Sequence, residues 1–156
     1  MNLWAVKLWR VIKLKKKKNK EKIFISRNKA NKRKILNENI LHDILRKHNF
    51  KIVFSEDLEY KEQVDLFYNS KIIISAHGAG LTNILFSEKA TVIELHPDSD
   101  VRSHYCLMSL ALNHNYHPIY LEAEDCLKKN PNMIVTNKNI LEIENLIKLS
   151  CKSVIS

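Results

Sequence analysis

The sequence predicts an α/β domain built on a doubly wound parallel sheet. From residue 22 onward, short β-branched runs alternate with longer stretches in which apolar residues recur at helical spacing, which is the pattern of successive βα units. The runs at 51–54, 71–75 and 91–95 are apolar almost throughout, as expected for strands that are buried on both faces of a parallel sheet. Two further runs, at 22–26 and 118–121, complete the set of predicted strands.

Amphipathic stretches between these runs predict the helices that cover the sheet. Apolar residues at helical spacing predict a first helix from about residue 35, which ends near Asn49 because asparagine tolerates the left-handed conformation of a C-terminal cap. Further helices are expected over 60–68, from 78–80 onward, over 102–112 and over 139–149. Because connections between parallel strands are right-handed, the economical architecture is a Rossmann-like sheet.

The length and composition fit one domain with one core, since the chain has 156 residues of which 45% are hydrophobic. We place this domain at 22–150, after a basic linker or amphipathic helix at 1–21 and before a short tail at 151–156. Charged residues interrupt the apolar residues of 1–14 too often for a signal peptide or a membrane span. That segment suits a helix that packs on a neighbouring domain, and the basic run after it also suits peripheral contact with an anionic membrane.

The net charge of +9, from 26 Lys and Arg against 17 Asp and Glu, makes an anionic partner plausible. Much of the excess lies before residue 35, and such a run is more often a solvated arm than a binding site. Cys106, Cys126 and Cys151 are far apart and form no CxxC pair, so neither a zinc site nor a disulfide framework is predicted. Five histidines show no metal-ligand spacing and are expected at the surface: His42, His48, His104, His114 and His117.

The segment from Ala76 to Asn83 carries the strongest local signal, because it holds both glycines of the chain at a strand-to-helix junction. A missing Cβ lets the backbone approach a ligand and permits a positive φ. The first N–H groups of the helix that follows suit a phosphate. The alternative is a tight turn whose glycines serve packing only. The binding residues predicted in this loop are His77, Gly78, Ala79, Gly80, Leu81, Thr82 and Asn83.

Charged residues after other predicted strands complete the candidate site, since ligands of open parallel sheets bind beyond the carboxyl ends of the strands. Arg27 and Arg33 follow the first strand, and guanidinium groups bind phosphate bidentately. In the usual doubly wound order the first and third strands are neighbours, so Arg27 would face the glycine loop; the alternative is a surface arginine beside a carboxylate. The carboxylate of Glu94 can accept hydrogen bonds from ribose hydroxyls. The alternative is a buried glutamate that is paired with a cation or with backbone donors. His77 is the candidate catalytic base, with a phosphate contact or a structural role as alternatives.

Four stretches of the chain resemble the glycosyltransferase family 61 domain of capsular-polysaccharide and protein O-glycosylation enzymes. The first combines IFISR at 23–27 with KRKILNE at 32–38, and it contains both candidate arginines. The others are EQVDLF at 62–67, HGAGLTNILF at 77–86 and VIELHP at 92–97. The resemblance as a whole covers roughly residues 22 to 122, with the four stretches in the order of the family.

The resemblance implies a GT-B glycosyltransferase that binds a nucleotide-sugar donor, expected to be a UDP-sugar, in its C-terminal half and transfers the sugar with inversion to a glycan or protein acceptor. This chain would correspond to that half, so an N-terminal domain is the missing partner and catalysis by the chain alone is in question. No cofactor is expected, and the need for a divalent metal is left open. The implied location is the cytosol of a bacterium or the secretory-pathway lumen of a eukaryote.

A competing hypothesis is a non-enzymatic module, either a degenerate nucleotide-binding domain or a basic protein that associates with RNA through residues 15–34. The basic run lacks the interleaved aromatic residues of a single-strand RNA surface, so no specific nucleic acid is expected as a partner.

Overall fold

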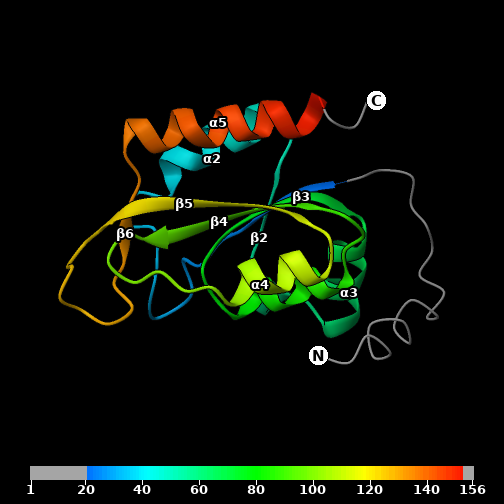
Figure 1. Ribbon diagram of the computed structural model, residues 1–156, viewed down its shortest axis with the longest axis horizontal. Coiled ribbons are helices and arrows are strands. Elements are labelled where there is room, and N and C mark those ends of the chain that lie inside the picture. Colours follow the sequence, from blue (N-terminus) through cyan, green and yellow to red (C-terminus); the bar gives the residue numbers. More distant parts are fainter. Residues whose placement is uncertain (1–20, 153–156) are drawn as a thin grey trace.

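A six-stranded sheet in the order β2-β1-β3-β4-β5-β6 forms the centre of the molecule. The computed structural model describes residues 21–152 (Figure 1). The strands are β1 (Glu21–Ile25), β2 (Lys51–Val53), β3 (Ser70–Ala76), β4 (Thr91–Pro97), β5 (Asn115–Ala123) and β6 (Met133–Ile134). All neighbouring pairs are parallel except β5 with β6, which are antiparallel.

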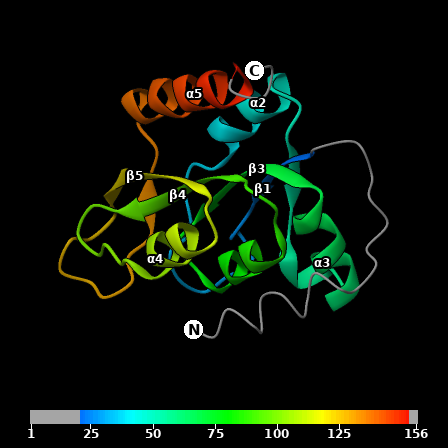
Figure 2. The ribbon, with the colours of Figure 1, turned by 45° about the vertical axis from the view of Figure 1, so that its right-hand side comes forward.

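Helices cover both faces of this sheet, as the two views agree (Figures 1 and 2). One face carries α2 (Asn39–Lys47) and α5 (Asn137–Lys152). The other face carries α3 (Tyr60–Tyr68), α4 (His104–Ala111) and the 3₁₀ helix η2 (Ala79–Phe86), while the short 3₁₀ helix η1 (Ser55–Asp57) leads from β2 toward α3. The prediction of an α/β domain with a mostly parallel sheet is therefore confirmed.

The core is divided by the sheet, because alternate residues of a strand point to opposite faces. On the face of α2 and α5, Phe24, Ile74 and Ile93 lie in one buried cluster. On the face of α3 and α4, Ile73 and Val92 lie in a second cluster. All seven residues of β4 are buried, which agrees with the continuous apolar run that predicted a central strand.

The strand neighbours that matter for the site are those expected. β1 pairs with β3 in parallel, with Ile25 opposite Ser75, and β3 pairs with β4, with Ser75 opposite Glu94. The carboxyl ends of three consecutive strands therefore meet at one edge of the sheet, where Arg27 and the glycine loop follow β1 and β3.

The helix predicted to begin at the glycines is present as the 3₁₀ helix η2. Three local features differ from the predictions. Strand β2, expected from its apolar run to be buried on both faces, lies at the edge of the sheet, and none of its three residues is buried. Strand β6 was not predicted, because two residues after a loop carry no periodic signal; it is held by pairing with β5 and by a parallel bridge between Met133 and Ile35. His114, expected at the surface, is 6% exposed: its Nδ1 accepts the N–H of Ala90 and its Nε2 donates to the carbonyl of Ile84. Burial lowers the pKa of His114, which agrees with a neutral ring in these two bonds.

The ends of the chain bear on two further predictions. The basic linker or amphipathic helix at 1–21 lies, except for residue 21, outside the described residues. Helix α5 continues to Lys152 and so includes the first residues of the expected tail. Within residues 21–152, every helix is too short or too polar to cross a membrane.

Candidate functional site

The sequence-predicted site residues gather at the carboxyl ends of β1, β3 and β4, on the face covered by α4 and η2. Arg27 leaves β1 beside the loop that follows β3, and the contact with Gly78 joins the two. We call the group formed by Arg27, Arg33, His77, Gly78 and Gly80 the glycine-loop site.

Gly78 is required because the guanidinium of Arg27 lies against it. A Cβ added to Gly78 would lie 2.0 Å from Nη1 and 2.6 Å from Cζ of Arg27, far inside van der Waals contact. Gly80 is less crowded, since its added Cβ would lie 3.4 Å from Ile25 Cγ2 and 3.5 Å from Ser55 Oγ. Neither glycine adopts the left-handed conformation that a missing Cβ would permit, and Gly78 is extended with φ 169°. The missing Cβ serves close approach instead.

The two arginines are held close to one another with part of their hydrogen-bonding capacity unused. Arg27 Nη2 donates to the carbonyl of Lys32 at 3.3 Å. The Nε atoms of Arg27 and Arg33 are buried and have no hydrogen-bond partner among residues 21–152. Burial lowers the pKa of both groups; the second cause is Arg33 for Arg27, and Arg102 for Arg33. Crowded guanidinium groups that remain protonated, with unmet N–H donors, are suited to an anion.

The backbone of Arg33 is also in an unusual conformation. Arg33 has φ 57°, a left-handed conformation that is uncommon for a residue with a long side chain. Such conformations persist only where the surroundings enforce them, and they concentrate at functional sites. Here the loop is held by Met133, whose N–H donates to the carbonyl of Lys34 and whose carbonyl accepts the N–H of Leu36.

Glu38 fixes the other side of the arginine loop from the start of α2. Its Oε1 accepts hydrogen bonds from Ser26 Oγ at 2.6 Å, from Asn28 Nδ2 at 3.0 Å and from His42 Nε2 at 2.9 Å. Glu38 is 2% exposed, and Ser26 and Asn28 flank Arg27 in the chain. The carboxyl group therefore anchors the residues on both sides of the arginine.

Arg102 lies near the site, but its charge is already paired. Its guanidinium donates from Nε and Nη2 to the two oxygens of Asp100, at 3.0 Å each, and Nη2 also reaches Asn130 Oδ1 at 3.1 Å. The hydrogen bond with Arg102 is the main cause that lowers the pKa of Asp100, and it raises that of Arg102. Of these three arginines, Arg27 and Arg33 are therefore the two whose buried Nε atoms lack a partner in the described part of the chain.

His77 and Glu94 form a buried pair behind the glycine loop. His77 Nδ1 lies 2.5 Å from Glu94 Oε1, and the other oxygen of Glu94 accepts the hydroxyl of Tyr116 at 2.6 Å and lies 3.3 Å from His96 Nε2. Burial alone would raise the pKa of Glu94, but the hydrogen bonds from His77, His96 and Tyr116 outweigh it and lower that pKa to about 2. Burial, and next the bond to Glu94, raise the pKa of Tyr116. Glu94 is thus a buried anion with neutral Tyr116 as a donor.

This arrangement places Glu94 differently from the ribose contact that its position suggests. The residue is 0% exposed and both of its oxygens are bonded inside the protein. Direct contact with a ribose would have to displace one of those donors. The geometry instead suits the other expectation, a buried glutamate that is paired.

A metal ion is the other group that the His77, Glu94 and His96 cluster could hold, because one ligand atom from each lies within 4.8 Å of the others. The bonds already described place protons in that space: Nδ1 of His77 donates to Glu94, and Tyr116 donates to the same carboxylate. A cation would have to replace those protons. We therefore describe the cluster as a hydrogen-bonded network.

The polar side chains of η2 are tied to neighbouring elements. Thr82 Oγ1 lies 3.3 Å from the hydroxyl of Tyr105, and Asn83 Nδ2 donates to Gln63 Oε1 at 2.7 Å. Gln63 in turn donates to the carbonyl of Ser55 at 2.9 Å. Of the remaining predicted loop residues, Leu81 is 0% exposed whereas Ala79 is exposed. The backbone at the start of η2 is the part of this segment best placed to meet a ligand, since the first N–H groups of a helix have no partner within it.

The sequence pattern does not single out three residues that lie at the site: Glu38, Tyr105 and Tyr116. The ring centroid of Tyr105 lies 5.2 Å from that of His77. Tyr116 donates to Glu94 from the first part of β5, which begins before the predicted strand at 118–121. A polar residue two positions before Pro118, on the face that Glu94 shares, was the available signal for Tyr116.

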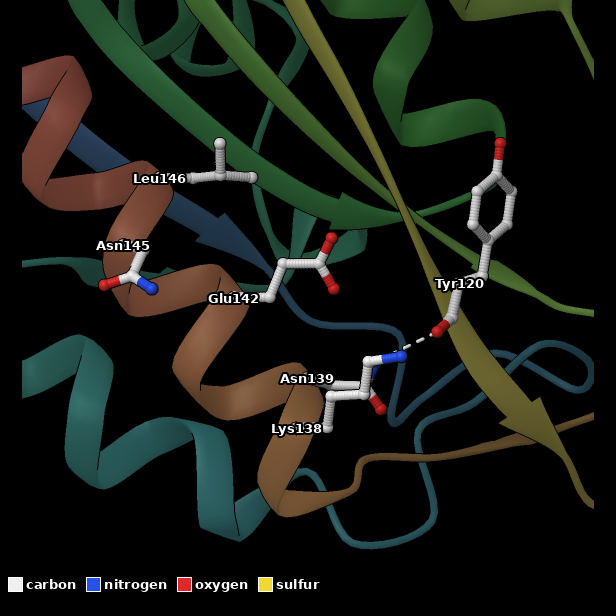
Figure 3. Close-up of a pocket in the computed structure, with 6 residues that line it drawn as sticks. All are labelled: Tyr120, Lys138, Asn139, Glu142, Asn145 and Leu146. Atoms are coloured by element: carbon white, nitrogen blue, oxygen red, sulfur yellow. Dashed lines mark hydrogen bonds between the residues drawn. The ribbon is translucent and has the colours of Figure 1, made fainter.

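A separate cavity of about 480 Å³ lies between α5 and β5 (Figure 3). It is lined by Tyr120, Lys138, Asn139, Glu142, Asn145 and Leu146. Asn139 Nδ2 donates to the carbonyl of Tyr120 at 2.9 Å across it. No residue of the glycine-loop site lines this cavity, which lies on the α5 face of the sheet.

Comparison with known proteins identifies relatives for part of this chain. The EGF domain-specific O-linked N-acetylglucosamine transferase of Gallus gallus is 37% identical over 109 residues, which are 66% of this chain and 20% of that protein. The protein of the same name from Canis lupus familiaris is 39% identical over 93 residues, 56% of this chain and 17% of its own length. The chain thus spans about a fifth of the length of these relatives.

The structural similarity to one solved protein is weak. The Clostridium botulinum CMP N-glycosidase has a TM-score of 0.41 and 14% identity, over 64% of this chain and 88% of that one. The family model for glycosyltransferase 61, in contrast, matches residues 7–93, more than half of the chain and including Arg27, Arg33 and the whole glycine loop. The chain belongs to the glycosyltransferase 61 family.

Proposed function

We propose that this chain is the donor-binding part of an inverting glycosyltransferase with Rossmann-like GT-B architecture. The donor is a nucleotide-diphosphate sugar, and the acceptor is a glycan or a protein. Because the relatives are named as N-acetylglucosamine transferases, UDP-N-acetylglucosamine is the first donor to test.

The observation that carries this proposal is the contact of the Arg27 guanidinium with Gly78. Among residues 21–152, Arg27 and Arg33 have buried Nε atoms without a hydrogen-bond partner, and both residues follow β1 at the carboxyl edge of the sheet. That is the edge at which open parallel sheets bind ligands. A diphosphate bound there would satisfy the guanidinium donors and be stabilised as a leaving group when the sugar departs.

The alternatives of a degenerate nucleotide-binding module and an RNA-associated protein have weaker support. The relatives are named as transferases, and within residues 21–152 the buried guanidinium nitrogens without a partner belong to Arg27 and Arg33. We propose no organic cofactor. Whether a divalent cation accompanies the diphosphate is decided by titrations with Mn²⁺ and with EDTA.

Titration calorimetry tests the proposal directly. We expect UDP to bind more tightly than uridine, because the site acts on the diphosphate. Replacing Arg27 with methionine keeps most of the apolar stem and removes charge-assisted hydrogen bonds, so affinity for UDP should fall roughly 10- to 100-fold.

Arg46→Met is the matched control, since Arg46 is a solvent-exposed residue of α2 with only an Asp43 ion pair at 3.5 Å. Equal affinities for UDP and uridine, or an equal loss from both substitutions, would remove the basis of the proposal.

A further inference from the structure

The pairing of His77 with Glu94 determines which ring nitrogen of His77 remains for a ligand. Ionised Glu94 only accepts hydrogen bonds, so Nδ1 of His77, 2.5 Å away, carries a proton. Nε2 has no hydrogen-bond partner among residues 21–152. In the neutral ring, Nε2 is therefore an acceptor, which an anion would repel.

Charges from several elements surround this ring. Behind it on β4 are ionised Glu94 and His96, whose ring centroid lies 5.4 Å from that of His77. On α4, the rings of His104 and Tyr105 lie 5.9 Å and 5.2 Å away. β5 contributes the neutral hydroxyl of Tyr116 through Glu94, and η2 contributes no charged side chain.

The remaining charges are cationic and come from the loop after β1. Arg27 touches Gly78, the residue that follows His77. Arg33 is close enough to Glu94 and Tyr105 for each to influence its pKa. A proton on Nε2 would thus add a third cation to the edge of the sheet that already carries two guanidinium groups, with Glu94 as the compensating anion. The negative charge of a bound diphosphate changes that balance, because it offsets the guanidinium groups and attracts the proton.

We propose that His77 takes up a proton on Nε2 when the diphosphate of a nucleotide binds, and donates a charge-assisted hydrogen bond to it. This inference rests on the proposed function and adds a residue to the same site. Glu94 acts as a positioning residue: it holds Nδ1–H and stabilises the imidazolium.

The consequence for sugar transfer follows from the direction of electron flow. As the bond between the anomeric carbon and the phosphate oxygen breaks, its electron pair passes to the diphosphate. The hydrogen bond from Nε2–H strengthens as that charge develops, which stabilises the transition state more than the bound donor. The proton remains on Nε2 and returns to solvent when the nucleoside diphosphate leaves.

Proton uptake can be measured on this chain without any transfer activity. UDP is titrated calorimetrically at pH 7.5, with EDTA present, in buffers of different ionisation enthalpy; the slope of the observed enthalpy gives the protons taken up. The wild-type chain should take up a substantial fraction of one proton more than His77→Gln. That variant should also bind UDP about 10-fold more weakly, as expected for one lost charge-assisted hydrogen bond.

His104→Gln is the matched control, because His104 is an exposed histidine whose ring lies 5.9 Å from that of His77. It should leave the proton uptake unchanged. Equal uptake by the wild type and His77→Gln, or a loss caused by His104→Gln instead, would overturn the proposal.

Nitrogen-15 NMR of the histidine rings gives a second measurement that does not depend on a variant. The ring of His77 should carry a proton on Nδ1 alone in the free protein and on both nitrogens with UDP bound. A neutral His77 ring in the complex overturns the inference while leaving nucleotide binding intact. Absence of UDP binding to the wild-type chain would instead overturn the proposed function.

Discussion

At the scale of single residues, the two glycines of the loop have different tasks. Gly78 leaves room for the Arg27 guanidinium, whereas an added Cβ on Gly80 would meet Ile25 and Ser55 at ordinary contact distances. Both glycines look alike in the sequence, as members of one turn. The structure therefore assigns the tighter constraint to Gly78.

We expect Gly78→Ala to weaken UDP binding at least 10-fold while the fold persists. The clash is with the end of a flexible side chain, and the extended φ of Gly78 is open to alanine, so Arg27 can swing away at small cost in stability. Arg46→Met, the exposed substitution on α2, is the control. The measurements are UDP affinity by calorimetry and thermal unfolding. A Gly78→Ala protein that binds UDP normally would show that Arg27 is not needed in its observed position.

At the scale of elements, the connection from β1 to α2 owes its conformation to contacts at both ends. Glu38 bonds Ser26 and Asn28 on either side of Arg27. The bridge between Ile35 and Met133 secures the segment after Arg33. A loop held in this way presents its arginines already oriented, which reduces the entropy that would be lost on binding.

We expect Glu38→Ala to lower UDP affinity about 10-fold and to destabilise the fold by roughly 2 kcal/mol, since it leaves the buried hydroxyl of Ser26 without an acceptor and removes the hydrogen bond from the exposed Asn28. Glu38→Gln retains an acceptor oxygen and should recover part of the affinity. Asp43→Ala, an exposed substitution on the same helix, is the control for α2. Calorimetry and urea unfolding provide the two measurements. Unchanged affinity in a folded Glu38→Ala protein would show that the anchoring does not matter for the site.

At the scale of the whole molecule, every group of the glycine-loop site comes from one sheet and the connections at its carboxyl edge. Transfer by an enzyme of GT-B type requires the acceptor oxygen and the anomeric carbon to be held within about 3–3.5 Å of each other. Among residues 21–152, the site contains groups suited to a diphosphate, and it contains no second domain to form an opposite wall.

We therefore expect this chain alone to bind UDP and to show no acceptor-dependent sugar transfer. Slow hydrolysis of UDP-N-acetylglucosamine is compatible with that expectation, because water needs no binding wall. The assay compares UDP release with and without an added acceptor, and then after supplying the remainder of a relative's chain. Acceptor-dependent turnover by the chain alone at ordinary enzyme rates would show that transfer does not need a second domain.

The sequence by itself determined the α/β class, five of the six strands and the position of the glycine loop. These features are local: an apolar run of five residues predicts a buried strand, and two glycines within three residues mark a turn, whatever the rest of the chain does. The neighbouring placement of β1 and β3 also followed, because doubly wound sheets have few topologies. The 3₁₀ form of η2 and the extended backbone of Gly78 did not follow from those patterns.

Only the tertiary structure decided which side chains meet. Arg27 and Gly78 are in contact across two strands, and Glu94 is bonded to His77 and to Tyr116, 17 and 22 residues away in the chain. Such contacts depend on strand register, and a shift by one residue would turn each side chain to the other face of the sheet. The position of Glu94 near the end of a strand left open a ribose contact or a buried pair, and the register of β3, β4 and β5 surrounds its buried carboxylate with His77, His96 and Tyr116.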